Sequence, residues 1–318
     1  MFQRILTPLD GSAYAEAALP MAARVAYASQ GTVVLLHVLS GPREFLPYLL
    51  PMMEPSTLTA DVDAASAYLA AVAEQPALSN VTTVTAVRSG LVSSTILDVA
   101  AEQRADLVVL AAHAHTGLAR WATGDVVSRL EHRGATPVLS LTDAGTLPTE
   151  GQPVQGLVLL DGAMEAEAAI APAKEILAAL SGPQHASATL RLAWIGAFEP
   201  GAQAPQPRGA MAPGDSDVAQ YLRSLEERLH TRSSGGEPLT VTSEVIAEED
   251  LPRAVAGLAQ QKQATFVALA PHTRRGFALH TSSDFDAHLR EATGLPLLLV
   301  PSQAARTDQA AGESEKKA

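Results

Sequence analysis

The sequence predicts an α/β protein with two tandem doubly wound domains, and three observations support this prediction. First, a segment with apolar residues, a histidine and a glycine occurs twice, so that His113 and His272 lie 159 residues apart. Second, the turn Asp10-Gly11 recurs as Asp161-Gly162. Third, each half alternates short apolar runs with helical stretches, the pattern of right-handed βαβ units. A repeat this long indicates a duplicated domain, because solenoid units are much shorter.

The first half contains nearly continuous apolar runs, as expected for parallel strands that are covered on both faces. The expected strands are Phe2–Leu9, Thr32–Leu39, Thr82–Arg88, Leu107–Ala111 and Val138–Leu141. The expected helices between them are Ala13–Ser29, Leu58–Gln75, Val92–Arg104 and Asp125–His132. Ser12 is suited to cap the first helix, and Pro20 to bend it.

The second half repeats this order of elements. The expected strands are Gly156–Leu160, Thr189–Ile195, Leu239–Val245, Thr265–Ala270 and Leu297–Val300. The expected helices are Glu165–Leu180, Val218–Leu229, Leu251–Gln261 and Asp284–Glu291. These patterns place one domain at residues 1–144 and another at 154–302, joined by a linker at 145–153. We expect the polar tail, 303–318, to be disordered.

Composition restricts the classes of function. The formal net charge is −12, which repels phosphate backbones and anionic lipids, so we expect neither nucleic acid nor a membrane as a partner. The chain has no cysteine, which excludes disulfides and thiolate metal sites. No apolar run reaches the roughly 20 residues that cross a bilayer. The N-terminus runs directly into a strand pattern rather than a signal peptide, so we expect a cytoplasmic protein.

In a doubly wound sheet, ligands bind beyond the carboxyl ends of the strands, where the strand order reverses. The first strand leads into Asp10, whose carboxylate can accept hydrogen bonds from a ribose hydroxyl or an adenine amine. Asp10 can equally serve, with Ser12, to cap the following helix. The fourth strand ends at Ala111 and leads through a glycine-containing loop to a helix N-terminus, a place that attracts phosphate.

Several short motifs occur together in this chain. They are Asp10-Gly11-Ser12, His37-Val38, Ala111-x-His113-x-x-x-Gly117, Gly124-x-Val126 and Thr136-Pro137-Val138-Leu139. The combination resembles the universal stress protein family, and the resemblance extends over both halves. It implies two Rossmann-like domains of the adenine nucleotide alpha hydrolase-like type, each with a five-stranded parallel sheet of order 3-2-1-4-5. It also implies an intrachain pseudo-dimer in which strands 138–141 and 297–300 pair antiparallel.

The resemblance further implies an adenine-nucleotide site in the first domain. Nucleotide-binding members carry the pattern Gly-x2-Gly-x9-Gly-Ser/Thr, whose positions here are Ala111, Ala114, Gly124 and Asp125. The matching adenosine contacts are Pro8, Asp10 and the backbone of Val38, and Val126 follows the phosphate turn.

The chain departs from this pattern most seriously at Asp125. Ser or Thr donates a hydrogen bond to phosphate, whereas a carboxylate only accepts and carries negative charge. Two like charges about 4 Å apart repel by roughly 4 kcal/mol at an effective dielectric constant of about 20. A Mg²⁺ ion that bridges Asp125 and the phosphates would reverse this sign, but capping of the following helix is the commoner use of such an aspartate. Ala114 also places a methyl group where the backbone would approach phosphate.

The second domain departs further from the pattern. Its phosphate positions are Ala270, Thr273, Ser283 and Asp284. Because Ser283 replaces a turn glycine, we expect no tightly bound nucleotide in this domain.

Other candidate chemistry is sparse. His113-x-His115 has no evident third ligand, so we expect no metal site. The recurrence of His113 as His272 favours a loop-structuring role instead. The sequence shows no nucleophile–base pair, paired carboxylates or Walker lysine, so we expect no catalytic residues.

Three functions stay open at this point. The first is a stress-response regulator or adaptor whose first domain binds ATP or another adenine nucleotide with weakened phosphate contacts. The second is a ligand-free module that binds an unknown protein partner through its surfaces and the apolar segment Phe45–Met53. That segment could equally cover the cleft or pack on the second domain. The third, less supported by the residues, is a slow ATP hydrolase.

Replacement of Asp125 by serine tests the repulsion argument. The Asp125→Ser chain is expected to bind ATP more tightly, by up to on the order of a thousandfold, because it exchanges a negative charge for a hydrogen-bond donor. Isothermal titration with ATP measures the change, and titration with adenosine is the control because adenosine has no phosphate. An ATP affinity equal to that of the parent chain would show that the Asp125 carboxylate does not lie close to the phosphates.

Overall fold

The computed structural model describes residues 1–39, 55–112, 124–142, 147–148, 151–182, 187–196, 215–231, 239–246, 248, 250–272 and 283–301. The segment Phe45–Met53 and the tail 303–318 lie outside these described residues. The chain divides into two compact units, Met1–Ala144 and Gly145–Ala318. Each unit is an α/β structure, and the two are described in turn.

The sheet of the first unit is fully parallel and confirms the predicted strand order. Its strands are β1 (Arg4–Leu9), β2 (Thr32–Leu39), β3 (Thr82–Ser89), β4 (Leu107–Ala111) and β5 (Val138–Leu141). They lie in the order β3-β2-β1-β4-β5. From β1 the chain adds β2 and β3 on one side and then crosses over to add β4 and β5 on the other side. The strand order therefore reverses between β1 and β4, and their carboxyl ends flank the switch point.

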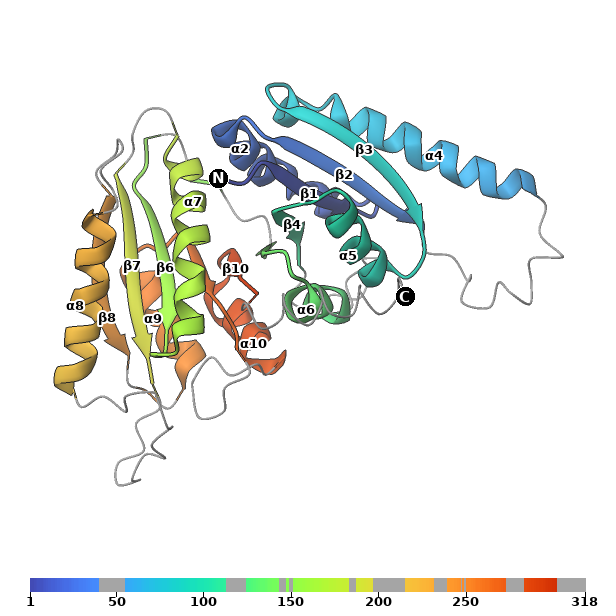
Figure 1. Cartoon of the computed structure of the whole chain (residues 1–318). Coiled ribbons are helices and arrows are strands. Elements are labelled where there is room, and N and C mark those ends of the chain that lie inside the picture. Colours follow the sequence, from blue (N-terminus) through green and yellow to red (C-terminus); the bar gives the residue numbers. More distant parts are fainter. Residues whose placement is uncertain are drawn as a thin grey trace, which may run out of the picture. The chain divides into compact units, whose positions relative to one another are not determined.

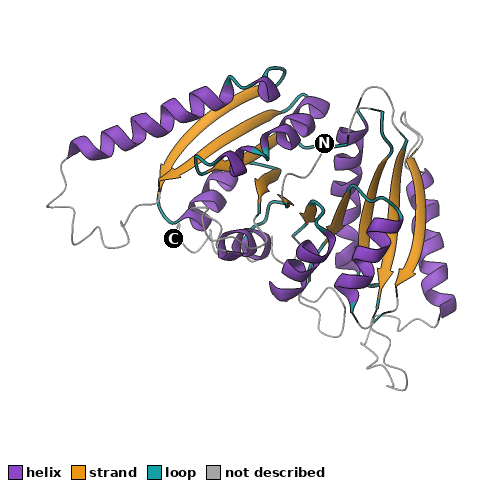
Figure 2. Ribbon diagram, turned by 180° about the vertical axis from the view of Figure 1, so that it is seen from behind, coloured by secondary structure: helices purple, strands orange, loops and turns teal. Residues whose placement is uncertain are grey.

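Helices cover both faces of this sheet (Figures 1 and 2). They are α1 (Ala13–Glu16), α2 (Leu19–Ser29), α4 (Pro55–Ala73), α5 (Val92–Glu102) and α6 (Gly124–Arg133), with a 3₁₀ turn, η3, at Pro76–Leu78. On one face, Ile96 of α5 and Leu130 of α6 pack with Leu6 and Val108 of the strands in one buried apolar cluster. The alternate strand residues point to the opposite face, which α2 and α4 cover.

The expected single helix Ala13–Ser29 is wrong: the structure has two helices, α1 and α2, separated at Ala17 and Ala18. Pro20 explains the break. Proline has no N–H to donate into a continuing helix, but it is tolerated in the first turn of a new one, where α2 places it. The N–H groups of Ala17 and Ala18 instead bond three residues back, to Tyr14 and Ala15.

The second unit repeats the same architecture. Its strands are β6 (Val154–Leu160), β7 (Ala188–Ile195), β8 (Leu239–Ile246), β9 (Phe266–Leu269) and β10 (Leu297–Leu299), in the order β8-β7-β6-β9-β10. Its helices are α7 (Ile170–Ser181), α8 (Asp215–Thr231), α9 (Leu251–Gln261) and α10 (Ser283–Thr293). The expected helix Glu165–Leu180 begins as a 3₁₀ turn, η4 (Met164–Ala169), because Pro172 lies in the first turn of α7.

Polar contacts join the amino end of each first strand to the strand that follows the crossover. Asp106, just before β4, accepts hydrogen bonds from the backbone N–H groups of Gln3 and Arg4. At the matching place in the second unit, Thr265 accepts from the N–H of Gln155. These contacts lie at the opposite end of the sheet from the switch point, so they set strand register and do not form part of a ligand site.

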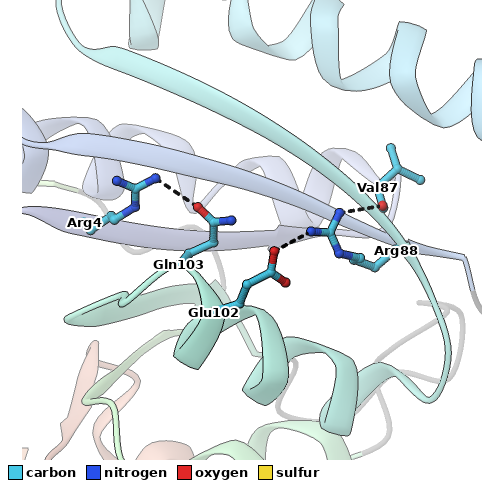
Figure 3. A network of polar contacts seen from close by, with 5 residues as sticks. All are labelled: Arg4, Val87, Arg88, Glu102 and Gln103. Carbon is cyan, nitrogen blue, oxygen red and sulfur yellow. Dashed lines mark hydrogen bonds and ion pairs between the residues drawn. The ribbon is translucent and has the colours of Figure 1, made fainter.

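The end of α5 is held by side chains from β1 and β3 (Figure 3). Arg4 donates to Gln103, and Arg88 forms an ion pair with Glu102 at 2.9 Å. The ion pair is exposed, with 40% and 54% of the two side chains accessible, so we expect it to add little stability.

A close approach between β6 and β9 allows a test of the core packing in the second unit. A Cβ atom on Gly156 would lie 2.7 Å from the ring of Phe266, which is fully buried. Gly156→Ala should therefore destabilise the protein by about 1–3 kcal/mol through overpacking, and Phe266→Leu should recover part of this loss. Urea unfolding measures both changes.

The control is Gly257→Ala in α9, where an added Cβ atom meets nothing within 4 Å. Alanine there should stabilise the helix by up to about 1 kcal/mol. If Gly156→Ala and Gly257→Ala change the free energy of unfolding equally, the Phe266 ring does not pack against Gly156.

Candidate functional site

The turn after β1 holds the first candidate residue in a defined geometry. Gly11 has φ +85°, a conformation that glycine adopts without strain, and it turns the chain from β1 into α1. Ser12 then caps α1, because its Oγ accepts a hydrogen bond from the N–H of Ala15 at 3.1 Å. Ser12 also donates twice to Oδ1 of Asp10, from its N–H at 2.9 Å and from its Oγ–H at 2.5 Å.

The bonds from Ser12 use one oxygen of Asp10. Within the described ranges, both hydrogen bonds of Asp10 end on Oδ1, and the residue is partly exposed. The two roles considered for Asp10 are therefore compatible. One oxygen orders the turn, while Oδ2 lies at the carboxyl end of β1 and can accept a bond from a ligand.

Other sequence-predicted residues lie at the ends of the adjacent strands. Pro8 is buried in β1, Val38 is buried near the end of β2, and Ala111 is partly exposed at the end of β4. Val126 of α6 packs against the same apolar cluster that contains Val38. The structure thus brings Pro8, Val38, Ala111 and Asp10 to one edge of the sheet, beside the switch point.

A tyrosine joins the first helix to the end of β4. The hydroxyl of Tyr14 donates to the backbone oxygen of Ala112 at 2.7 Å. Because α1 follows β1 and Ala112 follows β4, this bond crosses the switch point. It fixes the distance between the two strand ends near Asp10.

The phosphate part of the predicted site is described only in part. Ala114 lies outside the described residues. Gly124 and Asp125 form the first two positions of α6, and the structure describes their backbone but not their side chains. The assignment of these residues to phosphate stays a prediction.

Sequence analysis missed a group of side chains around the carboxylate of Glu16, next to the Asp10 turn, which we call the carboxylate cluster. Glu16 of α1 accepts hydrogen bonds from the hydroxyl of Tyr68 at 2.9 Å and from the side-chain amide of Gln75 at 2.7 Å. The ring of His37, at the end of β2, meets the Tyr68 ring edge-on with centroids 5.7 Å apart. The cluster therefore joins α1 and α4, and it borders the Asp10 turn.

The same cluster recurs in the second unit. Glu167 accepts from the hydroxyl of Tyr221 at 3.0 Å and pairs with Arg228 at 2.9 Å. The signal that could have found it is the repeat itself. Each glutamate follows the turn aspartate by six residues, and its two partners, Tyr68 with Gln75 or Tyr221 with Arg228, lie seven residues apart in the sequence.

The environment keeps both cluster tyrosines protonated. Burial raises the pKa of Tyr68 well above its ordinary value, and the hydrogen bond to Glu16 and the charges of Glu16 and Asp10 add to this. Burial likewise raises the pKa of Tyr221, and the charge of Glu167 and the hydrogen bond to Glu167 raise it further. Each phenol is therefore a stable hydrogen-bond donor to its glutamate.

The turn aspartate of the second unit has a different environment. Oδ1 of Asp161 accepts from the N–H of Ala163 at 3.1 Å. Its Oδ2 lies 2.9 Å from Nε2 of His272, and both side chains are only 1% exposed. Because a carboxylate only accepts, the imidazole nitrogen is the donor. Both oxygens of Asp161 are therefore occupied within the protein.

The turn after β1 supplies a carboxylate acceptor at the switch point. Among the residues that the structure describes, no three His, Cys, Asp or Glu side chains gather in a way that could hold a metal ion. None of the described helices is both long and apolar enough to cross a lipid bilayer.

Comparisons with known proteins agree with this architecture. Residues 1–141 match the model of the Universal stress protein family. A universal stress protein from Archaeoglobus fulgidus DSM 4304 is 15% identical, with a TM-score of 0.63, over 94% of this chain and 98% of that one. A structure from Pseudomonas aeruginosa UCBPP-PA14 that carries the same family name is 14% identical, with a TM-score of 0.59, over 96% and 95%. At these identities, the likeness shows the fold alone. No curated protein is significantly similar in sequence.

The raised pKa values predict a loss of stability at alkaline pH. In the unfolded chain a tyrosine loses its proton at pH about 10, whereas the folded protein holds the protons of Tyr68 and Tyr221 to higher pH. The unfolded state thus binds fewer protons, so the free energy of unfolding should fall as the pH rises above about 10. Urea unfolding at a series of pH values measures this fall.

Tyr68→Phe and Tyr221→Phe should each make the fall less steep. The control is Tyr27→Phe, which should leave the slope unchanged because that side chain is 57% exposed and hydrated in both states. A slope that is the same in all three variants would contradict the contribution of the cluster.

Proposed function

We propose that this chain, whose residues 1–141 match the model of the Universal stress protein family, is a cytoplasmic stress-response regulator whose first unit binds an adenine nucleotide. The observation that carries this proposal is the state of Asp10. Its turn is ordered by Ser12 through Oδ1, while the residue stays partly exposed at the switch point of the sheet. A ribose hydroxyl or an adenine amine supplies the donor that Oδ2 lacks among the described residues.

The proposed adenosine contacts are Pro8, Asp10 and the backbone of Val38, while Ala111 begins the phosphate pattern and Val126 follows the phosphate turn. Pro8 is an apolar residue of β1, which suits a purine, since small-molecule sites are mostly apolar with few directing polar groups. The Tyr14–Ala112 hydrogen bond supports this assignment, because it keeps the two strand ends at a fixed separation.

We expect the phosphates to contribute less than the adenosine. Ala114 and Asp125 replace a glycine and a hydroxyl residue of the phosphate pattern, and a carboxylate repels a triphosphate unless Mg²⁺ bridges the two. Binding should therefore weaken from adenosine monophosphate to the triphosphate in the absence of Mg²⁺.

The second unit is proposed to carry no nucleotide. The enclosed contact between Asp161 and His272 supports this, because a ligand would have to displace a bond already made inside the protein. In the proposal this unit, residues 154–302, pairs with the first through strands 138–141 and 297–300. The chain then acts by binding a ligand and a protein partner, without catalysis of its own.

A ligand-free interaction module is the second candidate. The substitutions at Ala114 and Asp125 favour it, because they weaken the phosphate contacts, and the apolar segment Phe45–Met53 would then serve a protein partner. The two candidates differ in one measurable property, which is whether adenine nucleotides bind to the folded chain.

Thermal unfolding with added adenosine monophosphate tests the proposed site. A ligand that binds only the native state, at about 100 times its Kd, should raise the stability by about 2.7 kcal/mol. Asp10→Asn should remove this rise, because the amide keeps an acceptor for Ser12 but presents N–H groups in place of Oδ2. The matched control is Asp161→Asn, which should keep the rise.

Two results would contradict the proposal. A parent chain that shows no shift at millimolar adenosine, adenosine monophosphate or ATP would support the ligand-free module instead. If adenosine monophosphate still stabilises Asp10→Asn but no longer stabilises Asp161→Asn, the ligand binds in the second unit, contrary to the proposal.

A further inference from the structure

The short helix that follows the Asp10 turn depends on polar contacts for its position. Helix α1 (Ala13–Glu16) is a single turn, and none of its residues is fully buried. A helix this short is not stable by itself, because nucleation fixes several residues for one hydrogen bond. Tyr14 ties it to the end of β4 through Ala112, and Glu16 ties it to α4. These contacts therefore decide where α1, and the turn in front of it, lie.

Glu16 connects α4 to the turn through a continuous series of hydrogen bonds. Its carboxylate accepts from the hydroxyl of Tyr68 at 2.9 Å and from the side-chain amide of Gln75 at 2.7 Å. Its backbone N–H donates to the carbonyl oxygen of Ser12 at 3.3 Å. Ser12 in turn donates twice to Oδ1 of Asp10. The series thus runs from Tyr68 to the carboxylate that is proposed to meet the ligand.

The hydroxyl of Tyr68 also lies beside the turn itself. Burial is the main cause of the raised pKa of Tyr68, but the charge of Asp10 also raises it and the backbone of Gly11 lowers it. A backbone N–H acts on a hydroxyl only at short range, so the two groups are close together. On the side of β2, the ring of His37 meets the Tyr68 ring edge-on, with centroids 5.7 Å apart. The phenol is therefore held between α1, the turn and β2.

We propose that Tyr68 is a positioning residue of the adenosine site, which holds the Asp10 carboxylate where a ligand donor can reach it. This inference rests on the proposed function of Asp10. It adds that part of the affinity comes from α4, which lies along β2 and β3 (Figure 1), through a side chain that acts by way of the turn. A carboxylate that is already ordered spares the ligand the cost of fixing it, and this raises the affinity.

Isothermal titration of the full chain with adenosine tests the inference. Tyr68→Phe keeps the ring and removes only the hydroxyl, and it should weaken binding about tenfold, the scale of one hydrogen bond to a charged group. Glu16→Ala removes the other partner and should also weaken binding. The double variant should bind no more weakly than Glu16→Ala, because the two residues act as one unit.

Tyr221→Phe is the matched control. It removes the equivalent bond, to Glu167, in the unit that is proposed to carry no nucleotide. Urea unfolding should show a loss of stability in both Tyr68→Phe and Tyr221→Phe, whereas only Tyr68→Phe should lose affinity for adenosine. Circular dichroism confirms that each variant is folded, and Tyr68→Phe or Glu16→Ala alone suffices where the other does not fold.

Adenosine analogues separate positioning of Asp10 from general damage to the fold. Dideoxyadenosine lacks the ribose hydroxyls and purine riboside lacks the adenine amine, so one of them lacks the donor that Asp10 is proposed to accept. That analogue should bind the parent chain more weakly than adenosine does. It should bind Tyr68→Phe as well as it binds the parent, because no bond to Asp10 is left to lose.

The outcomes separate the two proposals. A folded Tyr68→Phe or Glu16→Ala chain that binds adenosine as tightly as the parent overturns the role of Tyr68 and leaves the Asp10 site standing. An equal loss of affinity for adenosine and for both analogues would also overturn it, since such a loss does not act through Asp10. A parent chain that binds no adenosine overturns the proposed function and this inference together.

Discussion

A carboxylate at the end of a buried parallel strand needs hydrogen-bond donors, and this requirement organises the ligand end of both units. Asp10 and Asp161 occupy the same place, each followed by a glycine with positive φ that turns the chain into the first helix. In each turn, one carboxylate oxygen accepts from the residue two positions ahead. In the second unit, His272 contacts the other oxygen of Asp161. Its counterpart in the repeat, His113, lies outside the described residues.

The carboxylate cluster shows which features the duplicated domain keeps. Glu16 with Tyr68 and Glu167 with Tyr221 join the first helical turn of each unit to α4 or α8. The third member differs, since Gln75 gives a neutral amide where Arg228 gives a cation. The geometry that positions the turn is therefore present in both units, whether or not the turn aspartate is available to a ligand. We infer that the cluster serves the architecture of the turn.

The positions of the strands could be predicted from the sequence because apolar runs are strong local signals, whereas their order followed from the resemblance to the universal stress protein family. Helix bounds were less predictable where proline acts within a first turn, as Pro20 does in dividing α1 from α2. The carboxylate cluster escaped prediction for a different reason. Glu16 and Tyr68 are 52 residues apart, and neither has a neighbour in the sequence that marks it as a partner.

The candidate site could likewise be predicted only in part. Asp10 could be identified from its place after the first strand, and the structure shows that it orders the following turn through Oδ1, while its role toward a ligand stays a prediction. The loop-structuring role expected for His272 agrees with its bond to Asp161, but the partner could not be named from the sequence. Only the folded sheet brings these residues together, because they are 111 positions apart.

The central claim is that the chain offers one adenosine site, at Asp10. A crystal structure of the full chain grown with adenosine monophosphate tests it most directly. The account predicts ligand density within hydrogen-bond distance of Oδ2 of Asp10, and an intact contact between Asp161 and His272. Nucleotide seated against Asp161, or crystals in which Asp10 remains without ligand at saturating nucleotide, would contradict it.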